Sequence, residues 1–461
     1  MRPGQKSPKL RDVTWDQLLN CTRLGCETHP EWSDDSARNE YQRDFDRIAF
    51  SRAFRRLQGK TQVFPIPEND VVHNRLTHSI ESSCVGRYLG GIVARQIGQP
   101  VELFSSVVSS ACLAHDIGNP PFGHSGEAAI AGFFEHGDGA AYMKGMTQEE
   151  RSDFTCFEGN AMALRMLCHS KPAKTSMLGG ERLTYTTLAA FAKYPRVSHL
   201  KTVDHRRASQ KKFGVFRSEL RDFRNIAEQL HLSKPGSDDC WYRHPLAFLV
   251  EAADDICYKV ADAEDGLKMN LMARDEIMPI LRRIAETHFP KNEISRDLAQ
   301  ITAPVETIGY LRAKAMNSLI YQCAAEFCKN ETDIMTAEYD APLLESIESM
   351  SDLQQLTTLT AERLYLAPMV VQIEAAGYKV LPGLLDALLQ AILNESGTTL
   401  GQKIAQNVPP EYRPAKDAQG HRAASIHETI MGIVEFVSGM TDKHAIWLFR
   451  ILNGISLPGY P

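Results

Sequence analysis

The segment CLAHDIGNPPFGHSGE, residues 112–127, gathers four side chains that can carry out metal or acid–base chemistry. His115 and Asp116 are adjacent, and His124 and Glu127 follow a turn rich in glycine, asparagine and proline. Imidazole and carboxylate groups together suit a divalent metal ion, and an imidazole near a carboxylate suits proton transfer. A helix that ends at this turn also needs polar residues, which is the structural alternative. The chemical interpretation requires further ligands elsewhere in the chain.

Two more histidines lie in the segment HNRLTHS, residues 73–79, where a helical pattern begins. His78 falls within the pattern, and Arg75 lies one turn before it on the same side. His73 is the other candidate in this segment. A single histidine on a helix is more often structural than a ligand. We count His78 as a candidate ligand because of the histidine–aspartate pair described above.

The fourth ligand is expected from the segment EAADDICYKVADAEDG, residues 251–266. Asp254, Tyr258 and Asp262 follow one another at intervals of four residues, so a helix places them within an arc of roughly 80°. The opposite face is an apolar stripe formed by Leu249, Ala252, Ala253, Ile256, Cys257 and Val260. A solvated acidic face is the plainer alternative, but such a row repels itself unless a cation lies opposite. We expect Asp254 to be the ligand, since Asp255 points in another direction.

The elements that position these residues are expected to be helices. Apolar residues recur at helical spacing in most of the chain, whereas alternating strand patterns are scarce. The segment 61–66, TQVFPI, is a candidate short strand or extended turn. Segments 135–157, 170–182 and 406–424 are rich in glycine, proline and charge, and are expected to be mobile insertions in one helical body. The sequence therefore predicts an all-α protein.

The composition narrows the class of protein further. The chain has 461 residues, of which 43% are hydrophobic and 23% charged, as in ordinary globular proteins. A net charge of −6 argues against a surface built wholly for nucleic acid. The ten cysteines form no CxxC pair, which favours a reducing cytoplasm. The N-terminus has no signal-like apolar region, and no apolar run approaches the length of a bilayer span. We expect a cytoplasmic protein without a membrane partner.

Longer motifs make a more specific connection. In chain order they are YQRDFDRIAFSRAFRRLQGKTQVFP, NRLTHSIE, AHDIGNPPFGHSGE, FEGNAMALR, LTYTTLAAFAKYP, EAADDICYKVADAEDG and SGMTDKHA. Together they resemble the deoxyguanosine triphosphate triphosphohydrolase (dGTPase) family of the HD phosphohydrolase superfamily, which is all-α. The resemblance extends from about residue 41 to about residue 450.

The resemblance also implies a division of the chain. An N-terminal segment, 1–40, precedes an HD-domain catalytic core at 41–275, with loop insertions at 135–157 and 170–182. Additional C-terminal helices, 276–461, are expected to pack on this core.

In that family a deoxynucleoside triphosphate is split into a deoxynucleoside and inorganic tripolyphosphate. The resemblance implies dGTP as substrate, with other deoxynucleoside triphosphates as further candidates. The metal ligands that it implies are His78, His115, Asp116 and Asp254. His124 and Glu127 would form the catalytic dyad, in which the carboxylate orients the imidazole and keeps it protonated for the departing 5′-oxygen.

The resemblance assigns further positions to the substrate. Tyr258 and Asp262 would meet the 3′-hydroxyl of the sugar, and Gln62 and Val63 would lie beside the deoxyribose and base. Triphosphate contacts and another residue of the site are implied at Arg75, Lys193, Lys212 and Asn160.

Cofactor and partners are less closely defined. Two histidine and two carboxylate ligands fit several ions; the resemblance implies Mg²⁺ or Mn²⁺, while Fe²⁺, Ni²⁺ and Zn²⁺ also suit the ligands. It implies a homo-oligomer, often a hexamer, and a nucleotide or single-stranded DNA is a candidate effector. Two alternatives stay open: another HD-type nucleotidase or phosphodiesterase, and a non-catalytic sensor of deoxynucleoside triphosphates.

Overall fold

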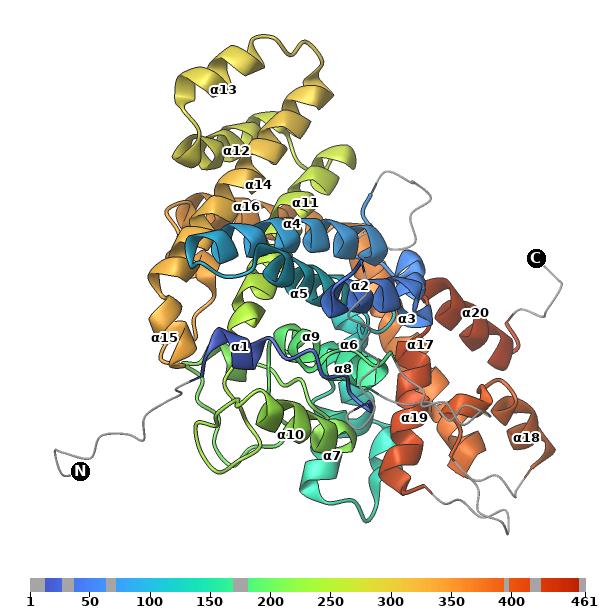
Figure 1. Ribbon diagram of the computed structural model, residues 1–461. Coiled ribbons are helices and arrows are strands. Elements are labelled where there is room, and N and C mark those ends of the chain that lie inside the picture. The colour runs from blue at the N-terminus through green and yellow to red at the C-terminus, as the bar shows by residue number, and fades with distance from the viewer. Residues whose placement is uncertain are drawn as a thin grey trace.

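The computed structural model describes residues 13–26, 37–63, 72–168, 181–393, 398–414 and 424–455. These residues form helices and their connections, and extended backbone pairs among them only in isolated bridges such as Thr61–Asn74. The predicted all-α fold is confirmed (Figure 1). Of the predicted strand or turn at 61–66, the described part is an extended segment, and residues from 64 on lie outside the described ranges.

The helices of the first half of the chain are α1 (Trp15–Leu18), α2 (Glu40–Phe50), α3 (Arg52–Arg56), η1 (Leu57–Gly59), α4 (Arg75–Gln96), α5 (Val101–Ala114), α6 (Gly123–Glu135), η2 (Asp138–Met143), α7 (Gln148–Thr155), α8 (Gly159–Cys168), α9 (Tyr185–Phe191), η3 (Ala208–Gln210), η4 (Arg217–Glu219) and α10 (Leu220–Gln229). Those of the second half are α11 (Pro245–Lys268), α12 (Arg274–His288), α13 (Lys291–Leu298), α14 (Pro304–Lys329), α15 (Glu331–Met335), η5 (Leu343–Ser346), α16 (Met350–Thr360), η6 (Ala361–Tyr365), α17 (Pro368–Leu393), α18 (Thr399–Ala405), η7 (Pro410–Tyr412), α19 (Ile426–Ser438) and α20 (Asp442–Leu452).

Helices α4, α5 and α11 pack on one another and form the centre of the molecule (Figure 1). Small residues let α4 and α5 approach closely: a Cβ atom at Gly86 would lie 2.6 Å from Cys112 Sγ, and one at Gly90 would lie 3.1 Å from Phe104 O. The side chain of Asn74 caps α4 by accepting a hydrogen bond from Thr77 N. The cap fixes where α4 begins, and with it the direction of its first turn.

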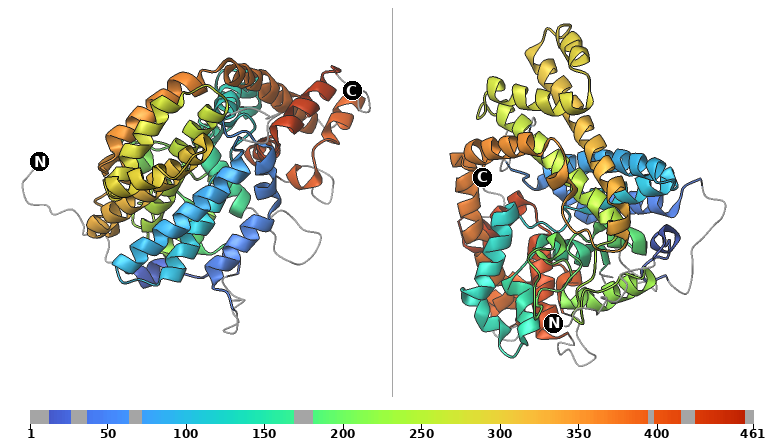
Figure 2. Two further views of the ribbon diagram at one scale, coloured as in Figure 1. Left: turned by 90° about the horizontal axis from the view of Figure 1, so that it is seen from above. Right: turned by 90° about the vertical axis from the view of Figure 1, so that its left-hand side faces the viewer.

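Two hydrophobic clusters form the core. The first is built on α4, α5, α9, α10, α11, α12 and α14, and the second on α6, α8, α17, α19 and α20. The C-terminal helices therefore divide between the two: α12, α14 and α16 join the first cluster, whereas α17 packs on α6 and is itself contacted by α18, α19 and α20. Helices α12 and α13 project from the body of the protein (Figure 2).

Helix α17 corrects one expectation about membrane spans. Its 26 residues include a window with a mean hydropathy of 1.2, which is long and apolar enough to cross a bilayer by length and composition. Half of that window is buried, and the helix packs against α6, α18, α19 and α20. We interpret α17 as a core helix, because its residues from Val380 to Ile392 contribute to the second hydrophobic cluster, although Met369, Val371 and Tyr378 near its start are exposed.

The predicted insertion at 135–157 is not a loop. It folds into η2 and α7, and the side chain of Thr147 caps α7 in a capping box with Glu150. Phe154 is fully buried, and Asp153 accepts a hydrogen bond from Ser198 Oγ. The prediction rested on composition alone, whereas the capping box at Thr147 and Glu150 starts a helix. The predicted insertion at 170–182 lies largely outside the described residues, whereas 406–414 of the insertion at 406–424 is described and contains η7, with Val408 and Tyr412 buried.

Candidate active site and metal centre

Three central helices bring the four predicted metal ligands together. His78 lies in the first turn of α4, His115 and Asp116 follow the last turn of α5, and Asp254 lies near the middle of α11. The ligand atoms of His78, His115 and Asp116 lie within 4.8 Å of one another. Asp254 Oδ1 lies 3.2 Å from His78 Nε2 and 3.3 Å from His115 Nε2.

The polar atoms of this cluster fit a bound cation. His115 donates from Nδ1 to the carbonyl oxygen of Cys112 at 2.6 Å, which fixes the tautomer and turns Nε2 toward the cluster. His115 Nε2 and Asp116 Oδ2 are buried and have no hydrogen-bond partner of suitable geometry within the described part of the chain. Buried polar atoms are costly to leave unpaired, and a divalent ion would satisfy both. His73 lies apart from this group, with its Nδ1 2.8 Å from Asp265 Oδ1.

The acidic face of α11 is not a solvated surface. The predicted apolar stripe on the opposite face is buried throughout. On the acidic face, Asp254 faces the histidines, while Asp255 lines the same cavity beside it. Burial, together with the charge of Asp254, raises the pKa of Asp255 to about 6. Asp254 rather than Asp255 lies against the histidines, and its role as a metal ligand stays a prediction.

A cavity of about 530 Å³ opens from the cluster and joins most of the predicted site. Its lining includes the predicted residues Gln62, Val63, Arg75, His78, His115, Asp116, His124, Glu127, Asn160, Lys193, Lys212, Asp254 and Tyr258. Asp262 lies beyond this lining and is connected to it through Tyr365. The motifs are far apart in sequence, but the fold assembles them around one space.

The turn between α5 and α6 depends on close backbone approaches. A Cβ atom at Gly118 would lie 2.1 Å from the backbone of Ala163 on α8, so only glycine fits there. Phe122 and Gly123 both adopt left-handed backbone conformations, with φ of 66° and 58°. This turn directs the exposed side chain of His124 from the first turn of α6 into the cavity.

Glu127 is held by partners other than the predicted one. Its Oε1 accepts a hydrogen bond from Gly159 N at 2.7 Å, and its Oε2 lies 3.9 Å from Lys212 Nζ. The expected hydrogen bond between His124 and Glu127 is absent from the contacts of the described residues. Burial and the charge of Glu127 raise the pKa of the neighbouring Glu158 to about 7.

The three basic side chains predicted to bind the triphosphate each form an ion pair with a carboxylate. Arg75 Nη1 lies 2.9 Å from Asp116 Oδ1, and its buried Nε has no hydrogen-bond partner. Lys193 donates to Asp254 Oδ2 at 3.1 Å, and Lys212 donates to Glu158 at 3.0 Å. Burial acts to lower the pKa of Lys193, but the charge of Asp254 outweighs it and raises that pKa overall. The cavity is therefore lined by cations that carboxylates keep in place.

Tyrosines and a carboxyl group form the far wall, along α11. Tyr365 donates its hydroxyl proton to Asp262 Oδ2 at 2.6 Å, and its oxygen accepts a hydrogen bond from the Tyr258 hydroxyl. The rings of Tyr365 and Tyr258 are stacked, with centroids 6.4 Å apart. Burial raises the pKa of Asp262 to about 7 and that of Tyr258 to about 12. This wall therefore offers the hydroxyl groups of the tyrosines and the carboxyl group of Asp262 as hydrogen-bonding groups.

Comparison with known proteins agrees with this geometry. A model of the HD domain family matches residues 75–153. A deoxyguanosinetriphosphate triphosphohydrolase-like protein of Synechocystis is 38% identical over 96% of this chain and the whole of that protein. One from Pseudomonas aeruginosa is 36% identical over 97% of this chain and its own full length. The deoxyguanosinetriphosphate triphosphohydrolase of an Enterobacter strain is 31% identical over 90% of this chain and 94% of its own.

The chain belongs to the dGTPase family of HD-domain proteins. It is thereby a member of a phosphohydrolase family whose HD domain depends on a metal, and its own histidine–aspartate cluster fits one. The resemblance inferred from the sequence motifs is confirmed.

The sequence motifs did not identify every residue of this dGTPase-family site. Tyr365, Glu374 and Tyr194 line the cavity, and Asn119 donates a hydrogen bond to the ligand Asp116. Tyr365 belongs to η6, a turn of π-helix, which often occurs at functional sites. Nothing in the local sequence marks this turn. Asn119 lies inside a motif that the sequence analysis singled out and was recognisable as a polar neighbour of the ligand pair.

Proposed function

We propose that this chain hydrolyses deoxynucleoside triphosphates, with dGTP as the first candidate, to a deoxynucleoside and inorganic tripolyphosphate. The observation that carries the proposal is the single cavity that joins the metal cluster, three phosphate-binding cations and His124. The names of the relatives, which cover nearly the whole chain, support the same activity.

The metal cluster and the cations account for the triphosphate. An ion held by His78, His115, Asp116 and Asp254 would activate water and polarise the phosphoryl group under attack. Arg75 carries a planar guanidinium that binds phosphate oxygens through two donors. Lys193 and Lys212 would exchange their present carboxylate partners for phosphate oxygens.

We assign proton donation to His124. Its side chain is exposed to the cavity and carries no partner that would hold it away from the departing 5′-oxygen. Glu127 would act by fixing the Gly159 amide and Lys212 beside the imidazole, since these are the groups that it contacts. Acid catalysis by a positioned side chain is worth roughly 10²- to 10⁴-fold in rate.

The tyrosine wall suits the sugar. Tyr258 and Asp262 would meet the 3′-hydroxyl, with Tyr365 fixing both of them. Gln62 Oε1 is buried and has no hydrogen-bond partner among the described residues, so we assign it as an acceptor for a donor from the sugar or base. Val63 supplies an apolar surface next to it.

The remaining assignments follow from the same proposal. Mg²⁺ or Mn²⁺ would fill the site, in a homo-oligomer of cytoplasmic location, with the catalytic core at 41–275 and the helices 276–461 packed against it. The ten cysteines are free, which agrees with a reducing compartment. A nucleotide or single-stranded DNA remains a candidate effector.

The test is a product assay on the purified protein. Each deoxynucleoside triphosphate is incubated with Mg²⁺ or Mn²⁺, and the products are separated by ion-exchange chromatography. Tripolyphosphate and deoxynucleoside in equal amounts would support the proposal. Orthophosphate or a nucleoside monophosphate would favour another HD-type hydrolase, and tight binding without turnover would favour a sensor.

A variant at His124 tests the assigned acid. We expect His124→Ala to retain nucleotide and metal binding and to lose roughly 10²- to 10⁴-fold in kcat. The matched control is His136→Ala, because His136 lies at the exposed other end of α6. A His124→Ala protein that turns over at the rate of the control would remove His124 from the reaction.

A further inference from the structure

The corner between α19 and α20 contains the motif SGMTDKHA, residues 438–445, to which the proposed function assigns no role. Asp442 is the first residue of α20 and is only 1% exposed. A carboxylate so deeply buried requires hydrogen bonds to satisfy its oxygens. Its partners show what this corner does.

The two oxygens of Asp442 bind two different segments of the site. Oδ2 accepts hydrogen bonds from the backbone N–H of Thr61, at 3.0 Å, and from the Thr61 hydroxyl. Oδ1 accepts one from the backbone N–H of Phe122 at 3.2 Å. One carboxylate therefore connects two segments separated by about sixty residues, and both run directly into the cavity.

Each of these segments positions a residue of the cavity. Thr61 precedes Gln62 and Val63, and Phe122 precedes the first turn of α6, where His124 lies. Phe122 has a left-handed backbone, which a bulky side chain adopts only when its surroundings impose it. The bond from the Phe122 amide to Asp442 is one of the contacts that impose it.

A second set of hydrogen bonds, made by Lys60, connects the same parts of the protein. Lys60 is 2% exposed, and its Nζ donates to the carbonyl oxygens of Asn119, at 2.5 Å, and Ser438, at 2.8 Å. Its own carbonyl oxygen accepts from Arg75 N at 3.2 Å. The corner between α19 and α20 is therefore connected to the turn between α5 and α6 at two points. Lys60 bonds to both of them, and the carboxylate of Asp442 bonds directly to Phe122.

We propose that Asp442 is a positioning residue, which holds residues 61–63 and the start of α6 in fixed relation across the cavity. It places Gln62 and His124 on either side of a bound nucleotide without touching the nucleotide itself. The consequence for the reaction rests on the proposed function, whereas the consequence for the two segments does not.

The test compares Asp442→Asn and Asp442→Ala with Thr441→Ala. Asparagine keeps one acceptor oxygen and alanine keeps none. Thr441 caps α20 by accepting a hydrogen bond from His444 N at 3.2 Å, so its removal loosens the same helix without breaking either set of hydrogen bonds. Thermal unfolding ranks the three variants by stability.

Amide hydrogen exchange is the readout that does not depend on activity. We expect exchange at Thr61 and Phe122 to rise in both Asp442 variants, more in alanine than in asparagine, and to stay unchanged in Thr441→Ala. Mn²⁺ affinity, measured by calorimetry, should remain within a few-fold of wild type, because neither segment carries a metal ligand. Unchanged exchange at both amides in both variants would overturn the proposal.

Kinetics supply the second readout. We expect Asp442→Ala to lower kcat by about 10- to 100-fold, since small misplacements of reacting groups have effects of this size. KM should rise at the same time, because Gln62 moves with Thr61, and Asp442→Asn should fall between alanine and wild type. An equal loss of kcat in Thr441→Ala would reduce Asp442 to general stability and overturn the proposal. A wild-type protein without activity, combined with the expected exchange, would overturn the proposed function and leave the positioning role standing.

Discussion

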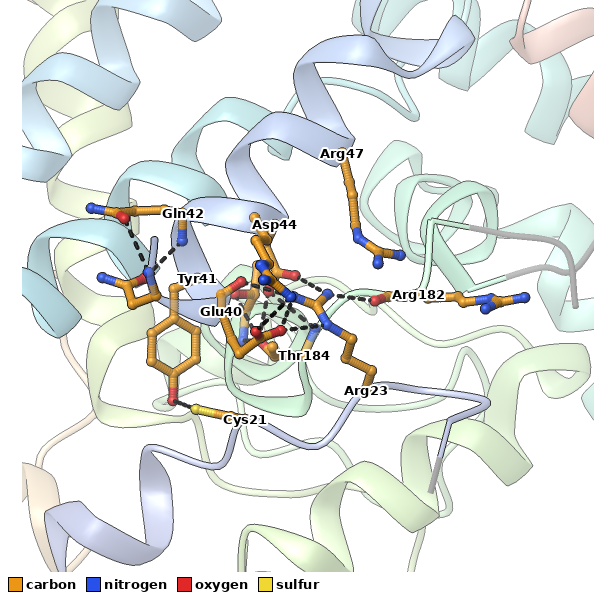
Figure 3. A network of polar contacts seen from close by, with 12 residues as sticks. Cys21, Arg23, Glu40, Tyr41, Gln42, Asp44, Arg47, Arg182 and Thr184 are labelled. Atoms are coloured by element: carbon orange, nitrogen blue, oxygen red, sulfur yellow. Dashed lines mark hydrogen bonds and ion pairs between the residues drawn. The ribbon is translucent and has the colours of Figure 1, made fainter. Parts of the chain in front are cut away.

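The cluster around Arg23 and the cluster around His115 both bury charged side chains in the same helical body, yet they differ in how fully their polar atoms are paired. Arg23 connects the N-terminal segment to α2 and to the segment before α9 (Figure 3). Its five N–H donors reach Glu40, Asp44 and the carbonyl oxygen of Arg182. The far oxygen of Asp44 accepts two hydrogen bonds from Thr184.

The His115 cluster differs in that several of its buried polar atoms are unpaired among the described residues. His115 Nε2, Asp116 Oδ2 and Arg75 Nε are buried without hydrogen-bond partners. The cationic side chains of Lys193 and Arg75 form ion pairs with the carboxylates of this cluster. A cluster whose polar atoms are all paired, such as that around Arg23, connects segments of the chain. A cluster with unpaired polar atoms, such as that around His115, can still bind a ligand, and we call it the open cluster. The difference lies in unused donors and acceptors, not in the number of charges.

The largest expected effect comes from removing a ligand of the open cluster. Asp254→Ala should abolish metal binding and lower turnover by roughly 10³-fold or more, since it removes a proposed ligand of the ion and leaves Lys193 without its carboxylate. Asp255→Ala is the matched control, because Asp255 lies beside the ligand without contacting the histidines. Elemental analysis measures the metal content. Loss of metal from the control but not from Asp254→Ala would place the site on the wrong residue.

Breaking the fully paired cluster around Arg23 should lower the free energy of unfolding and leave the rate of reaction unchanged. Arg23→Met leaves the buried Asp44 without its cationic partner and Glu40 with Arg43 alone, and should cost about 3 to 5 kcal/mol in the free energy of unfolding. The control is Arg43→Met, because Arg43 pairs with Glu40 at a partly exposed position and should cost about 1 kcal/mol or less. Denaturant unfolding supplies both values. A large fall in kcat for folded Arg23→Met protein would contradict the distinction between the clusters.

A smaller effect is expected from substitutions in the wall of the cavity that we propose binds the sugar. Tyr258→Phe and Asp262→Asn should each reduce the preference for a deoxynucleotide over its 2′,3′-dideoxy analogue by about 10-fold, because a binding hydroxyl or carboxyl group is lost. The measurement is the ratio of kcat/KM for the two substrates. Glu264→Gln, on the same helix but paired with Arg312, is the control. An unchanged ratio in both variants would remove these residues from the sugar site.

The smallest effect is a pH dependence of stability. The pKa of Asp262 is raised by burial from 3.8 to about 7, so the native state holds this proton through that interval while the unfolded chain releases it. Its contribution to stability is complete below about pH 4 and is lost as the pH rises through about 7. Between pH 5 and pH 8, the Tm of metal-free wild type should fall relative to that of Asp262→Asn by about 1 to 3 °C. Parallel pH profiles for the two proteins would contradict the raised pKa.

Periodicity and spacing predicted the parts of the site that lie on regular helices. The apolar stripe of α11 fixes its orientation, and this orientation turns Asp254 toward His78 and His115. The contact of Glu127 with Gly159 was beyond prediction, because it depends on how α8 packs against the turn before α6. Tyr365 was missed for the same reason: an irregular turn between two long helices gives no periodic signal. Local rules act within a few residues, whereas these contacts depend on tertiary packing.

The two larger hydrophobic clusters carry different parts of the proposed reaction, and we expect them to open as separate cooperative units. The four proposed metal ligands lie on or just after α4, α5 and α11 in the first, while His124 and Glu127 lie on α6 in the second. Units of this kind open with their own free energies, often below that of global unfolding. A molecule whose second unit has opened keeps its ligands in place and loses its acid. Heating should therefore silence turnover before it releases the metal, so that the first thermally damaged form of this protein is a metal-loaded, inactive one.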